Sequence, residues 1–421
     1  MVKNKSWLIV VFLLTILISM FLTLSNSGFQ ANVEALFENG AIRVPTDYPN
    51  ITSALINCAD GDTIIVEPGI YYESLIQINK TVRIVGMDRE NTVIDGSGTT
   101  AFIFKINVGN VIIENFTCQN TNLFYLDVAA IRVYNVTNVT IRDMIFTNVY
   151  VGVQLIRSNL TNLMFSQFLN IKYCGVNIKT VSCNSSLVGN TFENITAVVI
   201  SDVDSQFTKI YHNNFVNATL PFPSAAVFFD DGYPSGGNYW SDHVAQDMYN
   251  GPYQNVTGGD GILDVGYPSG DYPWDMYPLA NPFLKITVTV ELEDFDVFVS
   301  TNATLVSNEF NVSDKTLALT LESVEDGICS CRVVIPKSLL SCDSLNEWVV
   351  LLGGDVLSYL PYEDGEFTYL YFVCAQLMPE SVIEIVGNQA VPEFSILAFL
   401  FISLVCCLVV LGIKIKYGWT R

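Results

Sequence analysis

The chain has 421 residues, of which 50% are hydrophobic and 15% are charged, and its formal net charge is −22. This acidity argues against a nucleic-acid partner, because phosphates require a cationic surface. The 12% of aromatic residues argues against intrinsic disorder, because such a chain can bury a hydrophobic core.

The N-terminal segment, residues 1–30, has the features of an export signal. Lys3 and Lys5 precede an unbroken apolar run from Trp7 to Leu24. A charged start followed by an apolar run is typical of a secretory signal. The run is also long enough to remain in a membrane. We therefore expect a signal peptide or a signal anchor.

Residues 41–62 are predicted to cap the domain that follows. Between Pro49 and Cys58, the apolar residues Ile51, Ala54 and Leu55 recur at helical spacing. A short amphipathic helix here would cover the first strands of that domain and hide an open sheet edge.

Residues 63–232 contain an internal repeat. Five ten-residue segments end on Asn, and successive final Asn residues are 28, 22, 24 and 23 positions apart. The segments are Val111–Asn120, Val139–Asn148, Thr161–Asn170, Ser185–Asn194 and Thr208–Asn217. Two positions before each final Asn stand Cys118, Phe146, Phe168, Phe192 and Phe215.

Short alternating runs lie between these segments, and this period of two indicates strands with one buried face. Examples are Ala130–Val133, Val151–Leu155, Val176–Ile178 and Ala226–Phe229. A repeat of this length with several short strands fits one coil of a parallel β-helix, whose coils stack into a continuous core. The Phe residues would form one internal column, and the Asn residues would occupy the corners. The leucine-rich repeat is the main competitor, but its Leu consensus is missing.

Several motifs resemble the NosD-like, or CASH, group of the pectin-lyase-like superfamily. They are "RVPTDYPNITSALINCADGDTIIVEPGIYYESLIQINKTVRIVG", "TVIDGSG", "GGNYWSDH" (Gly236–His243), "GGDGILD" (Gly258–Asp264) and "YPL" (Tyr277–Leu279). The resemblance covers residues 41–283, with terminal loops at 233–283. It implies a right-handed parallel β-helix. It implies little about function, because the superfamily includes lyases, hydrolases, binding proteins and accessory factors.

Residues 284–388 are predicted to form a small β-sandwich, because alternating strands are separated by Gly-Asp and Asp-Gly turns. The expected strands are Lys285–Glu291, Leu317–Leu321, Arg332–Ile335, Trp348–Leu352 and Phe367–Val373. This segment resembles the membrane-proximal β domain of archaeal surface proteins. The predicted fold class is thus all-β, a right-handed parallel β-helix followed by a β-sandwich.

Residues 391–421 are predicted to hold a C-terminal transmembrane helix. The apolar run from Phe394 to Ile413 is long enough to span a bilayer, and the basic residues after it place this end in the cytoplasm. Lys3 and Lys5 place the other end there too, so 30–391 would lie outside the cell, at its surface. Pro392, Glu393 and Phe394 resemble the archaeal PEF-type sorting signal, which implies an archaeosortase and a secretion translocon as partners. The alternative is a plain membrane anchor.

Glycosylation sequons and cysteines agree with an exterior location. Twelve sequons lie in the predicted exterior: Asn50, Asn79, Asn115, Asn135, Asn138, Asn159, Asn184, Asn194, Asn217, Asn255, Asn302 and Asn311. Cys342 and Cys374 are candidate disulfide partners for Cys329 and Cys331. Cys174 and Cys183 could close a small loop.

The sequence offers few catalytic candidates. Asp230 and Asp231 form the only adjacent Asp pair, whereas the other motifs of pectin-cleaving β-helix hydrolases are missing. Strand alternation places a row of polar side chains on the outer face of the predicted β-helix. This row lacks the carboxylate cluster that a pectate-type lyase uses, and it is typical of a solvated or sugar-binding surface. The row contains Arg132, Gln154, Asn177 and Lys179.

Calcium and copper are the two metals that the sequence brings into question. Asp260, Asp264, Asp271 and Asp275 stand among glycines and could supply oxygen ligands to calcium; a plain acidic loop is the alternative. The NosD-like namesake assists copper-site maturation, but the chain has only two His residues, too few for a copper cluster.

The sequence as a whole predicts a membrane-anchored surface glycoprotein that binds carbohydrate or is structural, and that has no catalytic activity. The alternative is a surface-tethered polysaccharide lyase or glycoside hydrolase. A role in copper maturation is the third and least favoured hypothesis.

Overall fold

The computed structural model describes residues 40–124, 127–201, 204–219, 227–271, 273–291, 293–322, 328–374, 377 and 380–391. The two apolar end segments and the Pro-Glu-Phe motif lie outside these residues. None of the helices within the described ranges is long and apolar enough to cross a bilayer. The described residues divide into two compact units, and the first holds the chain up to 185 with 195–206. The second holds 186–194, 207–219 and the chain from 227 onward.

The first unit begins with the predicted cap. Helix α3 (Ile51–Asn57) starts at Asn50, whose side-chain oxygen accepts a hydrogen bond from the Ser53 backbone N–H at 2.8 Å. This N-cap satisfies one of the helix's free donors. The helix buries Ile51, Ala54 and Leu55, which are the apolar positions that the helical spacing identified.

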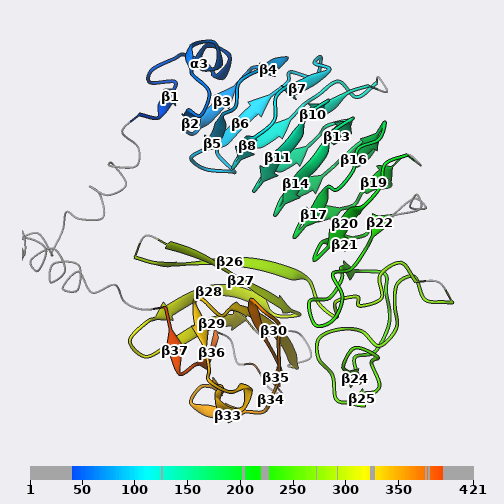
Figure 1. Ribbon diagram of the computed structural model, residues 1–421, viewed down its shortest axis with the longest axis vertical. Coiled ribbons are helices and arrows are strands. Elements are labelled where there is room, and N and C mark those ends of the chain that lie inside the picture. Colours follow the sequence, from blue (N-terminus) through cyan, green and yellow to red (C-terminus); the bar gives the residue numbers. More distant parts are fainter. Residues whose placement is uncertain are drawn as a thin grey trace, which may run out of the picture. The chain divides into compact units, whose positions relative to one another are not determined.

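Three parallel sheets follow in the first unit (Figure 1). The first sheet contains β1 (Ile42–Val44), β2 (Thr63–Val66), β5 (Arg83–Gly86), β8 (Val111–Glu114), β11 (Thr137–Arg142) and β14 (Asn159–Met164). The second contains β3 (Gly69–Tyr71), β6 (Thr92–Asp95), β9 (Thr117–Gln119), β12 (Ile145–Thr147) and β15 (Gln167–Leu169). The third contains β4 (Ile76–Ile78), β7 (Phe102–Ile106), β10 (Ala129–Tyr134), β13 (Val151–Ile156), β16 (Cys174–Lys179) and β19 (Val199–Ser201).

Each strand pairs with the equivalent strand of the next coil, which defines a parallel β-solenoid and confirms that prediction. A right-handed coil is the hand expected for parallel strands joined by crossovers. Inside, Phe146 lies opposite Cys118 on one side and Phe168 on the other. The rings of Phe146 and Phe168 stack at 4.8 Å, and both are fully buried.

The repeated Asn residues stand at corners, as predicted. Asn120, Asn148 and Asn170 have φ angles of 58°, 52° and 54°, a left-handed conformation that Asn tolerates. The Asn148 side-chain amide donates to the Asn120 side-chain oxygen at 2.5 Å. The corner residues therefore bond from coil to coil.

The second unit begins with coils of the same pattern. One sheet contains β17 (Ser186–Val188), β20 (Thr208–Tyr211) and β22 (Val227–Phe228), and another contains β18 (Thr191–Glu193), β21 (Asn214–Val216) and β23 (Tyr239–Trp240). Phe192 stacks on Phe215 at 5.5 Å, and Phe215 contacts Trp240 at 4.3 Å between ring centres. Trp240 in turn stacks on Tyr267, with 3.9 Å between the ring centres, so the aromatic column continues into the terminal loops. Loops with the hairpin of β24 (Tyr249–Asn250) and β25 (Val256–Thr257) follow.

Two antiparallel five-stranded sheets complete the second unit. One contains β26 (Phe283–Val290), β27 (Glu293–Thr301), β30 (Cys329–Pro336), β35 (Phe367–Cys374) and β34 (Tyr359–Glu363). The other contains β28 (Thr304–Asn311), β29 (Thr316–Glu322), β36 (Ser381–Val386), β32 (Val349–Leu352) and β33 (Asp355–Leu357). A short pair, β31 (Leu340–Ser341) and β37 (Gln389–Ala390), and the 3₁₀ helix η1 (Leu345–Glu347) lie beside them.

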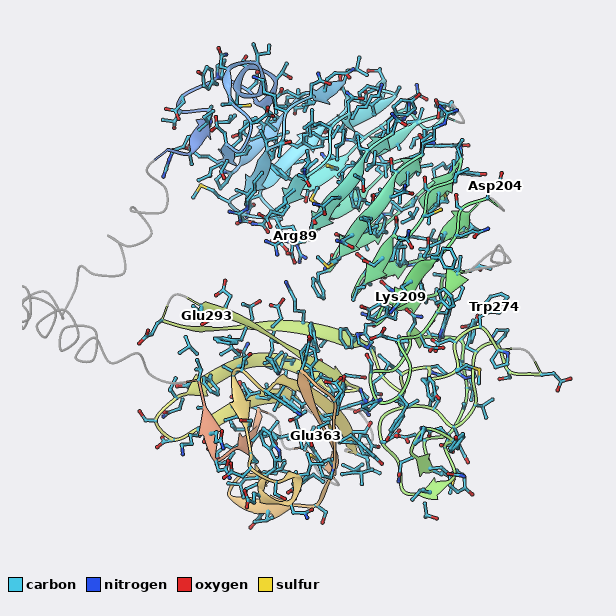
Figure 2. All side chains as sticks on the ribbon, viewed as in Figure 1. Arg89, Asp204, Lys209, Trp274, Glu293 and Glu363 are labelled. Atoms are coloured by element: carbon cyan, nitrogen blue, oxygen red, sulfur yellow. The ribbon has the colours of Figure 1, made fainter. Side chains whose placement is uncertain are left out.

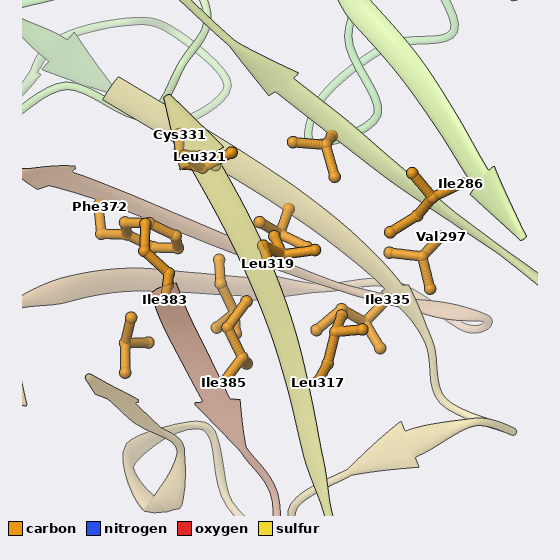
Figure 3. Close-up of a cluster of buried hydrophobic side chains, with 14 of the residues drawn as sticks. Ile286, Val297, Leu317, Leu319, Leu321, Cys331, Ile335, Phe372, Ile383 and Ile385 are labelled. Carbon is orange, nitrogen blue, oxygen red and sulfur yellow. The ribbon is translucent and has the colours of Figure 1, made fainter. Parts of the chain in front are cut away.

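The two sheets share one apolar core, which makes them a β-sandwich. Ile286, Val297 and Ile335 come from one sheet, and Leu317 and Ile383 come from the other (Figure 3). Each of these residues is at most 8% exposed. The predicted alternation therefore places apolar side chains on the inner face of both sheets. The segment boundaries proposed from the sequence at 30, 41, 283 and 388 stay predictions.

Candidate functional site

A column of polar side chains runs along the outer face of the sheet that contains β7, β10, β13 and β16. The strand register places Lys105 beside Arg132, Arg132 beside Gln154, and Gln154 beside Asn177. Neighbouring strands lie about 4.8 Å apart, so the four residues form a ladder about 14 Å long. We call these four residues the polar column.

Strand alternation explains why the polar column faces away from the coil interior. Val153 and Leu155 flank Gln154 and are 0% and 1% exposed; they point into the core, so Gln154 points outward. The same alternation applies to Arg132 and Asn177. Lys179 follows two residues after Asn177 on the same face.

The two amides of the polar column are nevertheless buried. Gln154 is 0% exposed and Asn177 is 2% exposed, so they are not the solvated positions that the sequence left open. Within the described chain, neither polar atom of the Gln154 amide has a hydrogen-bond partner, and nor does the side-chain oxygen of Asn177. Leaving a buried polar group unpaired costs about 1–3 kcal/mol. The fold thus tolerates a penalty at this place.

Charged and aromatic groups border the amides. The Arg132 guanidinium pairs with the Asp127 carboxylate at 3.1 Å and lies 5.6 Å from the Phe102 ring centre. Its buried Nε has no partner among the described residues. The Lys105 ammonium lies 5.1 Å from the ring centre of Tyr134, which is 39% exposed. The two cations and two neutral amides of the polar column therefore lie beside an exposed aromatic side chain.

The adjacent acids Asp230 and Asp231 are engaged separately. Asp231 forms an ion pair at 2.9 Å with Lys209, the residue labelled in Figure 2. Asp230 accepts hydrogen bonds from the backbone N–H groups of Gly232 and Met276, each at 3.0 Å. Both carboxylates therefore stabilise local structure rather than converging on a common point.

The four calcium candidates also have separate environments. Asp260 accepts from the Ile262 N–H at 3.0 Å, Asp264 accepts from the Tyr249 N–H at 3.0 Å, and Asp271 is exposed. No group of three or more His, Cys, Asp or Glu residues able to hold a metal occurs in the part of the chain that the structure describes. The structure does not bring these acids together, and a calcium site stays a prediction.

Asp275 anchors the terminal loops from a fully buried position. It accepts hydrogen bonds from the Asn238 backbone N–H at 2.7 Å and from the Trp240 indole N–H at 2.9 Å. Burial raises its pKa from 3.8 to about 7. Gly237 is required beside it, since a Cβ there would lie 1.9 Å from an Asp275 oxygen. The GGNYW motif therefore places Gly237, Asn238 and Trp240 around one buried acid.

Arg332 of β30 extends this anchoring and was not singled out by the sequence analysis. Its guanidinium is buried and donates to the carbonyl oxygens of Asp260, at 3.1 Å, and of Pro234. Asp247 accepts from the backbone N–H groups of Asp260 and Gly261, each at 2.9 Å, and burial raises its pKa to about 6. Arg332 and Pro234 are 98 residues apart, so no local pattern could reveal the contact.

The cysteines proposed to pair within the solenoid do not do so. Cys174 begins β16 and Cys183 lies beyond its end, and both are free thiols. The five-residue rise along that strand is about 16 Å, far beyond the reach of a disulfide.

No protein-family model matches the sequence, and no curated protein matches it. The chain is similar to the catalytic domain of a GH87 α-1,3-glucanase at 14% identity and a TM-score of 0.35, covering 51% of this chain and 49% of that domain. It is similar to the pectin methylesterase from carrot at 13% identity and a TM-score of 0.26, covering 48% of this chain and 80% of that one. The chain thus spans about half the length of the glucanase domain. These weak likenesses assign no activity, and the NosD-like relationship stays a prediction.

Proposed function

We propose that the chain is an exported, membrane-anchored surface protein whose solenoid binds a polysaccharide at the polar column without cleaving it. One observation carries the binding proposal: Gln154 and Asn177 are buried with unpaired polar atoms. Groups of this kind are costly in a fold that has no use for them. Because both side chains are buried, a ligand would recover their hydrogen bonds by displacing the side chains that cover them.

The chemistry of the column suits a sugar. A sugar hydroxyl both donates and accepts, and the Gln154 amide offers two donors and an acceptor. Arg132 adds a donor at its unpaired Nε. The exposed ring of Tyr134 offers an apolar face to the C–H groups of a pyranose. The regular step between strands suits a ligand with a repeating unit.

The absence of cleavage is part of the proposal and rests on the carboxylates. Inverting hydrolysis uses two carboxyl groups about 6.5–9.5 Å apart with water between them. Asp230 and Asp231 instead hold backbone N–H groups and Lys209. Beside the polar column, the carboxylate of Asp127 pairs with Arg132. A tethered hydrolase or lyase is the rival that the experiment must exclude.

Export and anchoring belong to the same proposal and are supported by the sequence alone. Basic residues flank both apolar end segments on the side predicted to be cytoplasmic. An archaeosortase would recognise the Pro-Glu-Phe motif. Residues 30–391 should be digested by protease on intact cells, whereas a tag after Arg421 should be protected. Digestion of the tag together with protection of the solenoid would reverse the topology.

The binding test uses the full chain in detergent on a glycan array. Gln154→Leu removes the amide at constant size, and Gln167→Leu in β15 of the same coil is the matched control. We expect binding of at least one polysaccharide class, weakened about tenfold or more by Gln154→Leu and unchanged by Gln167→Leu. Equal binding by both variants would exclude the polar column as the site.

The same samples decide between binding and cleavage. Incubation with each bound polysaccharide should release no reducing ends and no unsaturated uronides. Release that disappears in Asp230→Ala or Asp231→Ala would establish the enzyme instead.

A further inference from the structure

Three cysteines lie together inside the β-sandwich. Cys329 and Cys331 are on β30, and Cys374 is the last residue of β35. All three are 0% exposed and belong to the core (Figure 3 labels Cys331). All are free thiols in the structure. Two of them are held where a covalent bond could form.

The strand register selects one pair. Cys329 lies directly opposite Cys374, whereas Cys331 lies opposite Phe372. Residues directly opposite in antiparallel strands have Cα atoms about 4.5–5.5 Å apart and side chains on the same face. This spacing falls inside the Cα separation of about 4.4–6.8 Å found in disulfides. Cys342 lies outside the two strands, between β31 and η1.

The two thiols are also in electrostatic contact. A hydrogen bond between the sulfurs of Cys329 and Cys374 lowers the pKa of Cys329 below its usual value. The same bond and burial raise the pKa of Cys374. The Thr301 hydroxyl oxygen lies 3.5 Å from the Cys329 sulfur. The folded sheet therefore holds the two sulfurs in contact with each other.

We propose that Cys329 and Cys374 form a cross-strand disulfide, made during folding at the expense of an external disulfide such as oxidised glutathione. The Cys329 thiolate attacks one sulfur of the external disulfide, forms a mixed disulfide and releases one thiolate. The Cys374 thiolate then attacks the Cys329 sulfur and releases the second thiolate. The external disulfide is reduced by two electrons, the two cysteines are oxidised, and their protons end on the two released thiols.

This bond would join the neighbouring strands β30 and β35 at one end of their pairing, opposite the end at which Pro336 pairs with Phe367. Closing the long loop between the two cysteines restricts the unfolded chain, which is the main source of disulfide stabilisation in the chain-entropy model. We expect reduction of the bond to lower the melting temperature of the second unit by roughly 10 °C.

The test is a peptide map that needs no variant. The full chain is refolded in detergent with oxidised and reduced glutathione, blocked with iodoacetamide and digested without reduction. Mass spectrometry should find the peptides of Cys329 and Cys374 linked, with Cys331 alkylated once the chain is denatured. A link from Cys374 to Cys331 or Cys342, or three free thiols under every glutathione ratio, would overturn the proposal.

Matched variants add a second readout. Cys374→Ser should abolish the linked peptide and the shift in melting temperature on reduction. Cys331→Ala, two residues from Cys329 on the same strand, should keep both. Loss of the shift in Cys331→Ala with retention in Cys374→Ser would contradict the pairing. None of these readouts depends on polysaccharide binding, so failure here leaves the proposed function intact and the reverse also holds.

Discussion

The solenoid sheet of the first unit and the terminal loops of the second unit both bury polar side chains, but they treat them differently. In the loops, Asn238 is 0% exposed and its amide donates to the carbonyl oxygens of Ile210, at 2.9 Å, and Phe229, at 2.6 Å. In the sheet, Gln154 is equally buried, and its amide has no partner among the described residues.

The difference separates polar groups that stabilise the fold from polar groups that reduce its stability. A buried amide with partners fixes one conformation, whereas an unpaired one costs free energy. Natural sequences tolerate such local inconsistencies mainly at functional sites. The contrast supports the proposal that a ligand binds at the polar column and not at the acid-rich loops.

The largest expected effect comes from the apolar core that carries the polar column. Phe168→Ala should lower the free energy of unfolding by about 3–5 kcal/mol, because the ring is fully buried and stacks on Phe146. Phe124→Ala, at a ring that is 89% exposed, should change it by less than about 0.5 kcal/mol. Urea unfolding of both variants measures the difference. Equal, small losses would mean that the aromatic column does not support the coils.

The next effect is a pH dependence of the free energy of unfolding, which arises from the buried acid Asp275 in the terminal loops. The pKa of Asp275 is raised from 3.8 to about 7 by burial, so the folded state binds this proton more tightly than the unfolded state. Its contribution is fully present below about pH 4 and is lost as pH rises through about 7. We expect a loss of roughly 2–4 kcal/mol across that range.

Two substitutions in the loops test whether Asp275 causes this pH dependence. Asp275→Asn should flatten the decline, although Asp247, whose pKa is raised to about 6, leaves a part of it. Asp271→Asn, at an exposed position, should leave the decline unchanged. An identical pH profile for wild type and Asp275→Asn would show that Asp275 does not titrate as described.

The smallest expected effect is a difference in glycan occupancy between two of the sequons. The Asn115 side-chain amide donates to the Gly86 carbonyl oxygen at 2.6 Å, whereas among the described residues the exposed Asn79 side chain bonds through its oxygen, which accepts from Asn107 at 2.9 Å. A glycan attaches to the amide nitrogen, so we expect occupancy at Asn79 and none at Asn115. Glycopeptide mass spectrometry of the protein from its host measures both sites. A glycan at Asn115 would show that this corner bond is dispensable.

The sequence predicted those parts of the fold that repeat. Phe146 and Phe168 occupy equivalent positions in successive segments, and that regularity was enough to predict their stacking. The helix around Ala54 and the alternation in the sandwich strands were equally local signals. By parity, the sequence also placed Gln154 and Asn177 outside the coil.

Other features depend on contacts that no local pattern encodes. The burial of Gln154 cannot be read from its neighbours, because parity gives the direction of a side chain and not what surrounds it. Arg332 and Asp275 act on partners many residues away, so their roles emerged only from the fold. The acids between Asp260 and Asp275 are close in sequence, and separate loops hold them apart.

The central claim is that the unpaired amides of the polar column exist for a ligand, and one measurement addresses it directly. The free energy of unfolding is determined for wild type and Gln154→Leu, with and without the polysaccharide identified on the array. Without ligand, Gln154→Leu should be more stable by about 1–2 kcal/mol, because an unpaired buried group is removed. At a ligand concentration of 100 times Kd, wild type should gain about 2.7 kcal/mol and the variant much less. A variant that is less stable than wild type and gains equally from the ligand would contradict the account.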